Sequence, residues 1–418
     1  MNMNFQKNIF RKGIAAACLC LLVIMFQNCS KFSQIEPTAV TTAASNLPSS
    51  VGPTTPVFFG MMPMVDISKI PAGDPGTDKL LVFPVAPENM DPALKDINSP
   101  KFNLNTFRNW NPIHHYFNDR AELLYYDAAG NQTTVNTGKP VLNGGDARTS
   151  CKFANMKFDD PIVFPGQPGK SHLHAFFGNT GVDAFSTSKS LVAGGNSTCN
   201  GGIGNRSSYW VPAMIDTRNG IPIKPEGGGF YYKHGSISGK LIQVIPEGLR
   251  MIAGDGSNNL ASGNPHHRFK CIGGPNNEND KYGSGIGICD TGAQLWMEVF
   301  FPQCWDGVNL DSADHKSHMA YSVDVPGTGT NACPSTHPVA IPEVTYNIIY
   351  NVQAADDISK WRLSSDNYSP NLPGGYSSHG DYMFGWQKDV IAGIVKCSTI
   401  EGDCHSHLLG DGRYMGGY

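Results

Sequence analysis

Alternating apolar and polar residues between Glu343 and Val352 constrain the fold more than any other feature of this chain. A period of two places successive side chains on opposite faces of a strand, whereas a helix would mix the two sets. The apolar face would carry Val344, Tyr346, Ile348 and Tyr350. The segment therefore predicts a β-strand with one face in a core.

Three further segments have strand character and end at Gly, Pro or Asn clusters: Ser208–Ile215, Gly239–Pro246 and Gln294–Phe301. The best helical run is Lys388–Lys396. Gly (47) and Pro (29) are abundant, and charged residues make up 16% of the chain, against about 25% in an average soluble protein. We expect a mainly β fold, namely an antiparallel β-sandwich or jelly-roll-like core with long loops and few short helices.

Residues 1–28 predict a signal peptide. Basic residues at Lys7, Arg11 and Lys12 precede an uncharged apolar run at 13–26. This run is shorter than the roughly 20 apolar residues that span a bilayer, and it fits the core of an export signal. We therefore expect a protein outside the cytoplasm.

Cys29 follows the apolar run at the place where a bacterial lipoprotein carries its lipid. Gln27 and Asn28 depart from the small residues that usually precede such a cysteine, so an ordinary signal peptide or an uncleaved anchor is the alternative. The predicted location is the bacterial envelope, at its periplasmic or outer-membrane face, or the secreted fraction. The membrane would be contacted only through the N-terminal lipid.

Eight cysteines remain after Cys18 and Cys20 of the apolar run and Cys29 are set aside. An even number without a Cys-x-x-Cys pair predicts four disulfides rather than a zinc ribbon or a redox motif. Disulfides persist in oxidising compartments, which supports export. Because short loops close most easily, the favoured neighbours are Cys271–Cys289 and Cys397–Cys404. The other four are Cys151, Cys199, Cys304 and Cys333.

The mature chain divides into two predicted parts. Residues 29–56 are rich in Thr, Ser, Ala and Pro and predict a flexible, lipid-anchored tether. Residues 57–418 predict a single β-rich domain. A net charge of −4 and a pI near 6.3 show no excess of basic residues of the kind that binds nucleic acid.

Histidine-bearing segments are the candidates for chemistry. In an extended backbone His172 and His174 would point to the same side, about 6–7 Å apart. A second segment packs Asp306, Asp311, Asp314, His315 and His318 into 13 residues, and a third pairs His379 with Asp381. His337, Asp306 and the terminal Cys404–His407 segment are interpreted as structural or accidental.

Two kinds of site fit these residues. In a metal site, one divalent ion would bind His172, His174 and one of His315, His318 or His379, with an Asp nearby. In a metal-free hydrolase, an Asp with a raised pKa would serve as the acid and a His or second carboxylate as the base. Asp314 is the preferred acid or base. The full catalytic set is His172, His174, Asp311, Asp314, His379 and Asp381.

Aromatic residues flank these segments and would stack on sugar rings if they were exposed; if they were buried, they would belong to the core. The predicted substrate-binding residues are Tyr209, Trp210, Trp305 and Trp386.

Several of these strings resemble a secreted family known as domain of unknown function 1996, found in fungi and bacteria. The collinear matches extend over about residues 158–397. The resemblance implies an extracellular protein, and the wall-binding modules joined to fungal relatives imply a polysaccharide environment. It implies no activity. The matching strings are Asp160–Gly166, Ser171–His174, Ser208–Pro212, Pro246–Gly254, Phe301–Tyr321, Cys333–Pro338, His379–Asp381 and Gly385–Trp386.

The leading hypothesis is therefore an exported carbohydrate-active hydrolase, a glycoside hydrolase or a metal-dependent one, acting on a cell-wall glycan or extracellular polysaccharide. The alternative is a non-catalytic surface protein that binds a metal ion or glycan through the same residues. A purely structural envelope protein would instead have scattered histidines bonded to backbone groups.

Overall fold

The computed structural model describes residues 58–59, 61–83, 122–126, 132–136, 146–273, 282–399 and parts of 403–417. The described residues belong to one compact unit that spans Pro53–Tyr418. The predicted signal peptide (1–28), the tether (29–56) and the lipidation site Cys29 lie outside the described residues.

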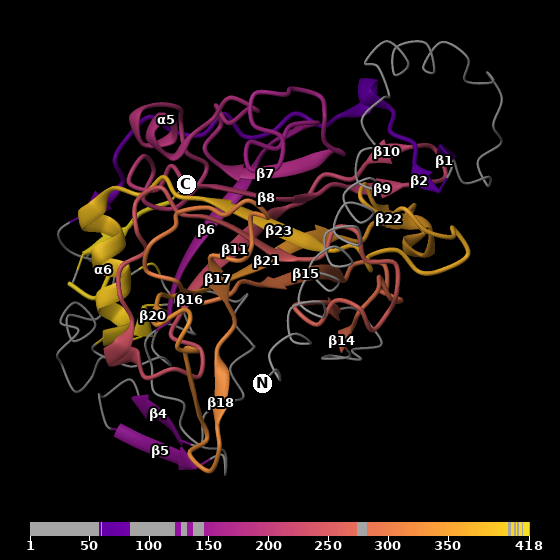
Figure 1. Ribbon diagram of the computed structural model, residues 1–418. Coiled ribbons are helices and arrows are strands. Elements are labelled where there is room, and N and C mark those ends of the chain that lie inside the picture. Colours follow the sequence, from indigo (N-terminus) through magenta and orange to yellow (C-terminus); the bar gives the residue numbers. More distant parts are fainter. Residues whose placement is uncertain are drawn as a thin grey trace, which may run out of the picture. The chain divides into compact units, whose positions relative to one another are not determined.

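An 11-stranded sheet forms the centre of the fold (Figure 1). Its order is β12-β23-β8-β7-β6-β11-β21-β15-β13-β14, with every pairing antiparallel, and β24 pairs with β6 in parallel. The strands are β6 (Asp146–Lys157), β7 (His174–Gly178), β8 (Ser208–Pro212), β11 (Gly227–Lys233), β12 (Arg250–Gly254), β13 (His267–Ile272), β14 (Tyr282–Gly283), β15 (Gln294–Phe300), β21 (Glu343–Asn351), β23 (His379–Met383) and β24 (Asp403–Cys404).

Short elements surround this sheet in the chain's long connections. The helices are η3 (Ile67–Lys69), α5 (Ser188–Ala193), η4 (Gly239–Leu241), η5 (Ile358–Lys360) and α6 (Lys388–Thr399). The short strands are β1 (Phe58–Phe59), β2 (Met62–Pro63), β3 (Val82–Phe83), β4 (Glu122–Tyr126), β5 (Gln132–Asn136), β9 (Met214–Asp216), β10 (Ile221–Pro222), β16 (Cys304–Trp305), β17 (Met319–Ala320), β18 (Val323–Val325), β19 (Thr330–Ala332), β20 (Val339–Ala340), β22 (Trp361–Leu363) and β25 (Tyr414–Met415).

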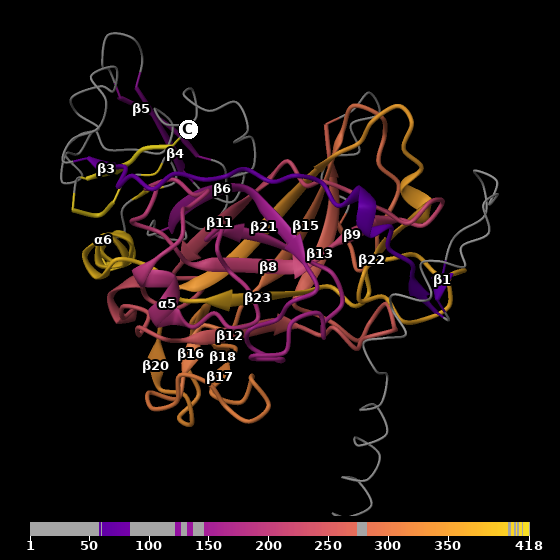
Figure 2. The ribbon, with the colours of Figure 1, turned by 90° about the horizontal axis from the view of Figure 1, so that it is seen from above.

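The sheet curls, and its first strand β12 comes close to β15. Figure 2 shows β8, β23 and β12 following one another along this part of the curled sheet. Aromatic rings fill the inner face: Tyr209 stacks on Phe230 at 4.1 Å, and Phe230 meets Tyr346 edge-on at 4.8 Å. Gly380 of β23 makes room, because a Cβ there would lie 3.1 Å from the Tyr346 ring.

The outer face of β7, β8 and β23 is covered by the chain between β6 and β8, including α5. Apolar side chains of this segment and of the outer face form a second, smaller core. Because side chains alternate along a strand, this face also receives His174, His379 and Asp381. The members of the second core are Ile162, Phe176, Val182, Leu191, Trp210 and Met383.

The mainly antiparallel β fold predicted from the sequence is confirmed. The strands predicted at 343–352 and 294–301 and the helix at 388–396 correspond to β21, β15 and α6. The strand predicted at Ser208–Ile215 is divided into β8 and β9 at Ala213.

The strand predicted at Gly239–Pro246 is wrong. The segment begins with the short helix η4, which contacts α6 instead of pairing with a strand. Gly239 lies so close to α6 that an added Cβ would be 2.2 Å from the Ser398 carbonyl oxygen. The alternating pattern of this segment does not show that Gly239 is needed for close packing against α6. The sequence therefore resembled a strand.

Four disulfides join all eight of the cysteines that follow Cys29: Cys151–Cys199, Cys271–Cys289, Cys304–Cys333 and Cys397–Cys404. The two favoured neighbour pairs are confirmed. Four disulfides are consistent with an exported protein. Within the described ranges, no helix is both long enough and apolar enough to cross a membrane.

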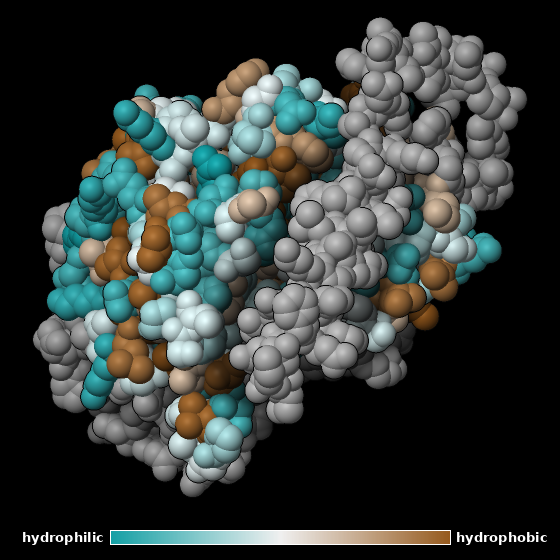
Figure 3. Space-filling model, in the orientation of Figure 1, coloured by the Kyte–Doolittle hydropathy of each residue, from teal (hydrophilic) through white to brown (hydrophobic). Residues whose placement is uncertain are grey.

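Apolar side chains also reach the surface on the loops, among them Phe185, Leu260, Ile288 and Val308. On the face shown in Figure 3, brown apolar residues are interspersed with teal polar ones. Scattered exposed apolar residues are ordinary in soluble proteins, so they do not by themselves mark an interaction surface.

Candidate metal centre

Three histidines from two distant parts of the chain meet on the outer face of the sheet. His172 lies in the loop before β7, His174 begins β7 and His379 begins β23. One ligand nitrogen from each lies within 4.8 Å of the other two. Among the described residues, this is the group of His, Cys, Asp and Glu side chains that could hold a metal ion.

The register of three neighbouring strands brings His174 and His379 together. His174 pairs with Pro212 of β8, and Asp381 pairs with Trp210 of the same strand. Continuing the second register by two residues brings His379 level with Pro212 as well. The two rings therefore flank one residue of β8, and their centroids are 5.8 Å apart.

Hydrogen bonds to the backbone set the tautomers of two of the rings. The Nδ1 atom of His174 lies 3.0 Å from the Asp159 carbonyl oxygen, and that of His379 lies 2.8 Å from the Ser377 carbonyl oxygen. A carbonyl oxygen only accepts, so each Nδ1 must donate its proton. The lone pair of each neutral ring then sits on Nε2, as metal ligation through that atom requires.

Two of the imidazoles carry buried nitrogen atoms without a hydrogen-bond partner in the described structure, namely the Nε2 atoms of His172 and His174. Buried polar atoms are almost always paired in folded proteins, and an unpaired one needs an explanation such as a bound ion. These atoms converge on the same small volume as His379, in a group that could hold such an ion.

Burial keeps the three rings neutral. Loss of solvent lowers the pKa of His174 and of His379 to about 4, and His174 pushes the pKa of His379 in the same direction. Burial and the other two histidines lower the pKa of His172 well below its usual value. Neutral imidazoles at pH 7 are ready to bind a metal without first losing a proton.

Two buried carboxyl groups lie beside the histidines. An Oδ2 atom of Asp381, without a hydrogen-bond partner in the described structure, is 4.0 Å from Nε2 of His379. Asp160 accepts the backbone N–H groups of Ile162 and Val163, both at 2.9 Å. Burial raises the pKa of both carboxyl groups, and the charge of Asp160 raises that of Asp381 further.

The sequence prediction did not include Asp160, although it begins the segment that contains His172 and His174. An Asp followed by Pro in a loop is typical of a turn residue, and this one does make turn-like backbone hydrogen bonds. Only the fold shows that its charge also acts on His379 and Asp381.

His315 and His318, predicted as metal ligands, are not part of the cluster. Both ring nitrogens of His318 are occupied, with Nδ1 2.9 Å from the Ser312 hydroxyl and Nε2 2.7 Å from the Arg250 carbonyl oxygen. His315 bonds through Nδ1 to Asp311 at 2.9 Å. Of the three alternatives for the third ligand, His379 is the one that lies in the cluster.

The carboxylates of the same loop also have structural surroundings. Asp311 forms an ion pair with Arg250 at 3.1 Å. Asp314 is exposed and accepts hydrogen bonds from the Ser312 hydroxyl and the backbone N–H groups of Lys316 and Ser317. These bonds hold the pKa of Asp314 well below its usual range, which argues against its predicted role as the acid or base.

Three of the four aromatic residues predicted to stack on sugars are in the core. Tyr209, Trp210 and Trp386 are at most 1% exposed, so their ring faces pack against protein. Trp305 is partly exposed, and its Nε1 donates to the Asn309 carbonyl oxygen. Of the predicted set, only Trp305 has a position that solvent reaches.

Comparison with curated proteins and with solved structures gives no match. The sequence model of one family, the Domain of unknown function (DUF1996), matches residues 160–386. The match covers more than half of the 418-residue chain and runs from Asp160 to Trp386, so it contains the three clustered histidines and both buried carboxyl groups. The chain therefore belongs to the DUF1996 family.

Proposed function

We propose that this chain is an exported metal-dependent hydrolase that holds one divalent ion at His172, His174 and His379. The observation that carries the proposal is the convergence of three neutral imidazoles, two of them with buried, unpaired Nε2 atoms. Three histidine ligands with a free coordination position are the donor set of catalytic zinc sites. Imidazole also suits copper, nickel and iron, so zinc is the first ion to test.

The residues beside the ion support hydrolysis. A zinc ion bound by three histidines lowers the pKa of a bound water to about 7 and so supplies a nucleophile at neutral pH. Asp381, whose Oδ2 is 4.0 Å from His379 Nε2, is placed to accept a hydrogen bond from a water at this centre. His174 and His379, both buried, keep their Nε2 atoms directed there through their backbone hydrogen bonds.

The proposed substrate is a polysaccharide of the cell wall or extracellular matrix. This substrate class rests on the extracellular, wall-associated setting that the family resemblance implies. The net charge of −4 supports a partner other than nucleic acid.

The alternative function is non-catalytic metal or glycan binding at the cell surface. The burial of His174 and His379 favours it, because only His172 of the three is partly exposed. A closed site that stabilises the fold would explain the same geometry.

Metal content and hydrolysis are measured on the same preparations of the exported full chain. We expect one bound zinc per chain by elemental analysis, lost in His174→Ala and His379→Ala and retained in His337→Ala. His337 is a suitable control, because it is partly exposed, lies outside the cluster and has Nε2 3.0 Å from the Ser317 carbonyl oxygen. A panel of wall glycans then separates the two functions.

Each outcome has a meaning. Cleavage of a glycan by the wild type that disappears with either alanine variant supports the hydrolase. Stoichiometric metal without cleavage supports the binding alternative. A wild-type protein that holds no metal, even after incubation with zinc, contradicts both metal-based functions.

We propose further that Cys29 anchors the chain in the bacterial envelope. Cys29→Ser should move the protein from the membrane fraction to the soluble fraction, and mass spectrometry of the wild-type N-terminus should find a diacylglycerol group. Equal partitioning of the two proteins would favour an ordinary signal peptide instead.

A further inference from the structure

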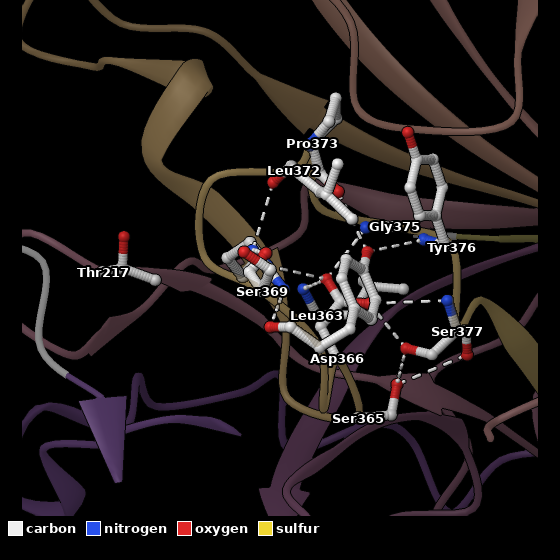
Figure 4. A network of polar contacts seen from close by, with 12 residues as sticks. Thr217, Leu363, Ser365, Asp366, Ser369, Leu372, Pro373, Gly375, Tyr376 and Ser377 are labelled. Carbon is white, nitrogen blue, oxygen red and sulfur yellow. Dashed lines mark hydrogen bonds and ion pairs between the residues drawn. The ribbon is translucent and has the colours of Figure 1, made fainter. Parts of the chain in front are cut away.

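Asp366 lies at the centre of the buried network that precedes β23 (Figure 4). Its side chain is 0% exposed. The loop that it closes begins after β22, runs through residues 364–378 and ends directly at His379. The hydrogen bonds that this carboxylate accepts therefore help to set the position of the backbone just before His379.

Each oxygen of Asp366 holds a different part of the loop. Oδ2 accepts the backbone N–H of Leu363 at 2.9 Å and that of Gly375 at 2.8 Å. Oδ1 accepts the hydroxyl of Ser377 at 2.6 Å and its backbone N–H at 3.4 Å. One carboxylate thus ties the beginning of the loop to its end.

The partner cation of Asp366 also fixes the loop. Arg362 lies 3.3 Å from Oδ2 through its Nε, and its two terminal nitrogens donate to the carbonyl oxygens of Ser369, Leu372 and Tyr368. The pair is almost fully buried. Breaking a buried network of polar contacts locally is costly, so these contacts favour the observed conformation of the loop.

Ser377 connects this network to the metal centre. Its hydroxyl also meets that of Ser365 at 2.7 Å, and its carbonyl oxygen accepts Nδ1–H of His379 at 2.8 Å. The residue is therefore held on one side by Asp366 and Ser365, and on the other it orients a ligand ring.

We propose that Asp366 is a positioning residue of the metal centre, which acts through Ser377 to fix the tautomer and direction of His379. The inference rests on the proposed metal binding and adds to it a residue outside the ligand set. Groups that orient a ligating histidine typically change metal affinity 10- to 100-fold when they are replaced.

The test compares Asp366→Asn with Asp216→Asn in the full chain. Asp216 is also buried and paired with an arginine, Arg218, and its described hydrogen bonds go to Arg218 and nearby backbone rather than to Ser377 or His379. Both variants therefore lose a comparable buried charge, but only Asp366→Asn replaces an acceptor oxygen in the network that holds His379.

We expect Asp366→Asn to weaken zinc binding about 10- to 100-fold in competition with a chromophoric chelator, and Asp216→Asn to bind like the wild type. With cobalt in place of zinc, the visible spectrum should change only in Asp366→Asn, because it reports the ligand geometry. Circular dichroism of both variants checks that they are folded.

The inference is overturned if Asp366→Asn matches Asp216→Asn in both affinity and cobalt spectrum while the wild type binds metal. A wild type that binds no metal overturns the proposed function itself. If Asp366→Asn does not fold, Ser377→Ala decides, since it removes only the hydroxyl that Asp366 holds; an unchanged affinity and spectrum there would also reject the inference.

Discussion

Gly256 packs against the ring of His379, and its lack of a side chain is part of the site. A Cβ at this position would lie 3.0 Å from both Cε1 and Nδ1 of His379. We expect Gly256→Ala to push the ring out of line with the other two ligands and to weaken zinc binding about tenfold or more. Chelator competition measures the dissociation constant.

Gly287→Ala is the matched control, because nothing lies within 4 Å of the added Cβ and the backbone there is not left-handed. It should bind zinc like the wild type. Equal dissociation constants for the two alanine variants would show that His379 tolerates a displaced ring, against the rigid geometry described above.

The lowered pKa of His174 gives the metal-free protein a defined pH dependence. Between pH 6.5 and about 4 an unfolded chain binds a proton at this histidine that the folded chain does not, because burial lowers the folded pKa to about 4. The contribution of His174 to the free energy of unfolding therefore falls as the pH falls through this window. For one such group the loss amounts to about 3 kcal/mol.

Urea unfolding of chelator-treated protein at several pH values checks this sign. His174→Gln should show a shallower decline from pH 6.5 to 4 than the wild type, and His337→Gln the same decline. His172 and His379 act in the same direction as His174, whereas Asp160 and Asp381, with raised pKa values, act in the opposite one. All four are present in every protein compared. A decline that is unaffected by His174→Gln would contradict a buried, neutral His174.

At this scale the sequence predicted half of the site. The spacing of His172 and His174 was sufficient to predict two converging rings. Choosing among His315, His318 and His379 was not possible, since all three stand beside Asp residues in Gly- or Ser-containing segments. What separates them is whether their ring nitrogens are already bonded, and only the fold decides this.

The loop between β16 and β17 contains predicted site residues that lie outside the histidine cluster, namely Asp311, Asp314, His315 and His318. It is a self-bonded structure in which Asp306, Asp311 and Asp314 accept hydrogen bonds from their own neighbours. Its Lys316 reaches the metal-centre side, donating at 2.8 Å to the carbonyl oxygen of Gly254 at the end of β12. The loop supports β12, and β12 pairs with the strand that begins at His379.

His318→Ala should therefore affect stability rather than metal content. The ring is 1% exposed, and its removal leaves the buried Arg250 carbonyl oxygen and the Ser312 hydroxyl without this partner, a loss of about 1–3 kcal/mol. Denaturant unfolding measures the loss, and elemental analysis should still find one zinc per chain. Loss of the metal with little change in unfolding free energy would return His318 to the ligand set.

The strands themselves were predictable to different degrees. β21 follows from alternation because its apolar face, which includes Ile348 and Tyr350, is buried in the core, whereas Asn347 and Asn351 on its other face are partly exposed. β7 and β23 do not follow in this way. All five residues of each are buried, so both faces are covered and the period of two disappears from the sequence.

In the whole molecule, the two faces of the curled sheet carry different kinds of side chains. The inner face holds stacked aromatic rings that stabilise the fold, and the outer face of the β7-β8-β23 wall holds the histidines and carboxyl groups. His172 and His379 are 207 positions apart in the chain, and three strands of the sheet order, β23, β8 and β7, lie between the edge strand β12 and β6. Sequence patterns are local, so they predict a β fold but not which strands adjoin.

The disulfides allow a comparison at this largest scale, because they close loops of very different size. Cys151–Cys199 spans 48 residues and joins β6 to the segment before β8, whereas Cys397–Cys404 spans 7 residues and joins the last turn of α6 to β24. Loop-closure entropy predicts that the longer bridge contributes about 4 kcal/mol and the shorter about 2 kcal/mol to the free energy of unfolding. The double variants Cys151→Ala/Cys199→Ala and Cys397→Ala/Cys404→Ala, unfolded in urea, should show losses in that order.

Because the long bridge also anchors the strand next to β7, its loss should weaken zinc binding as well, whereas loss of the short bridge should leave zinc binding unchanged. Equal losses from both pairs would indicate that the unfolded chain is already restricted near residues 151 and 199, and that the bridges act mainly through native packing.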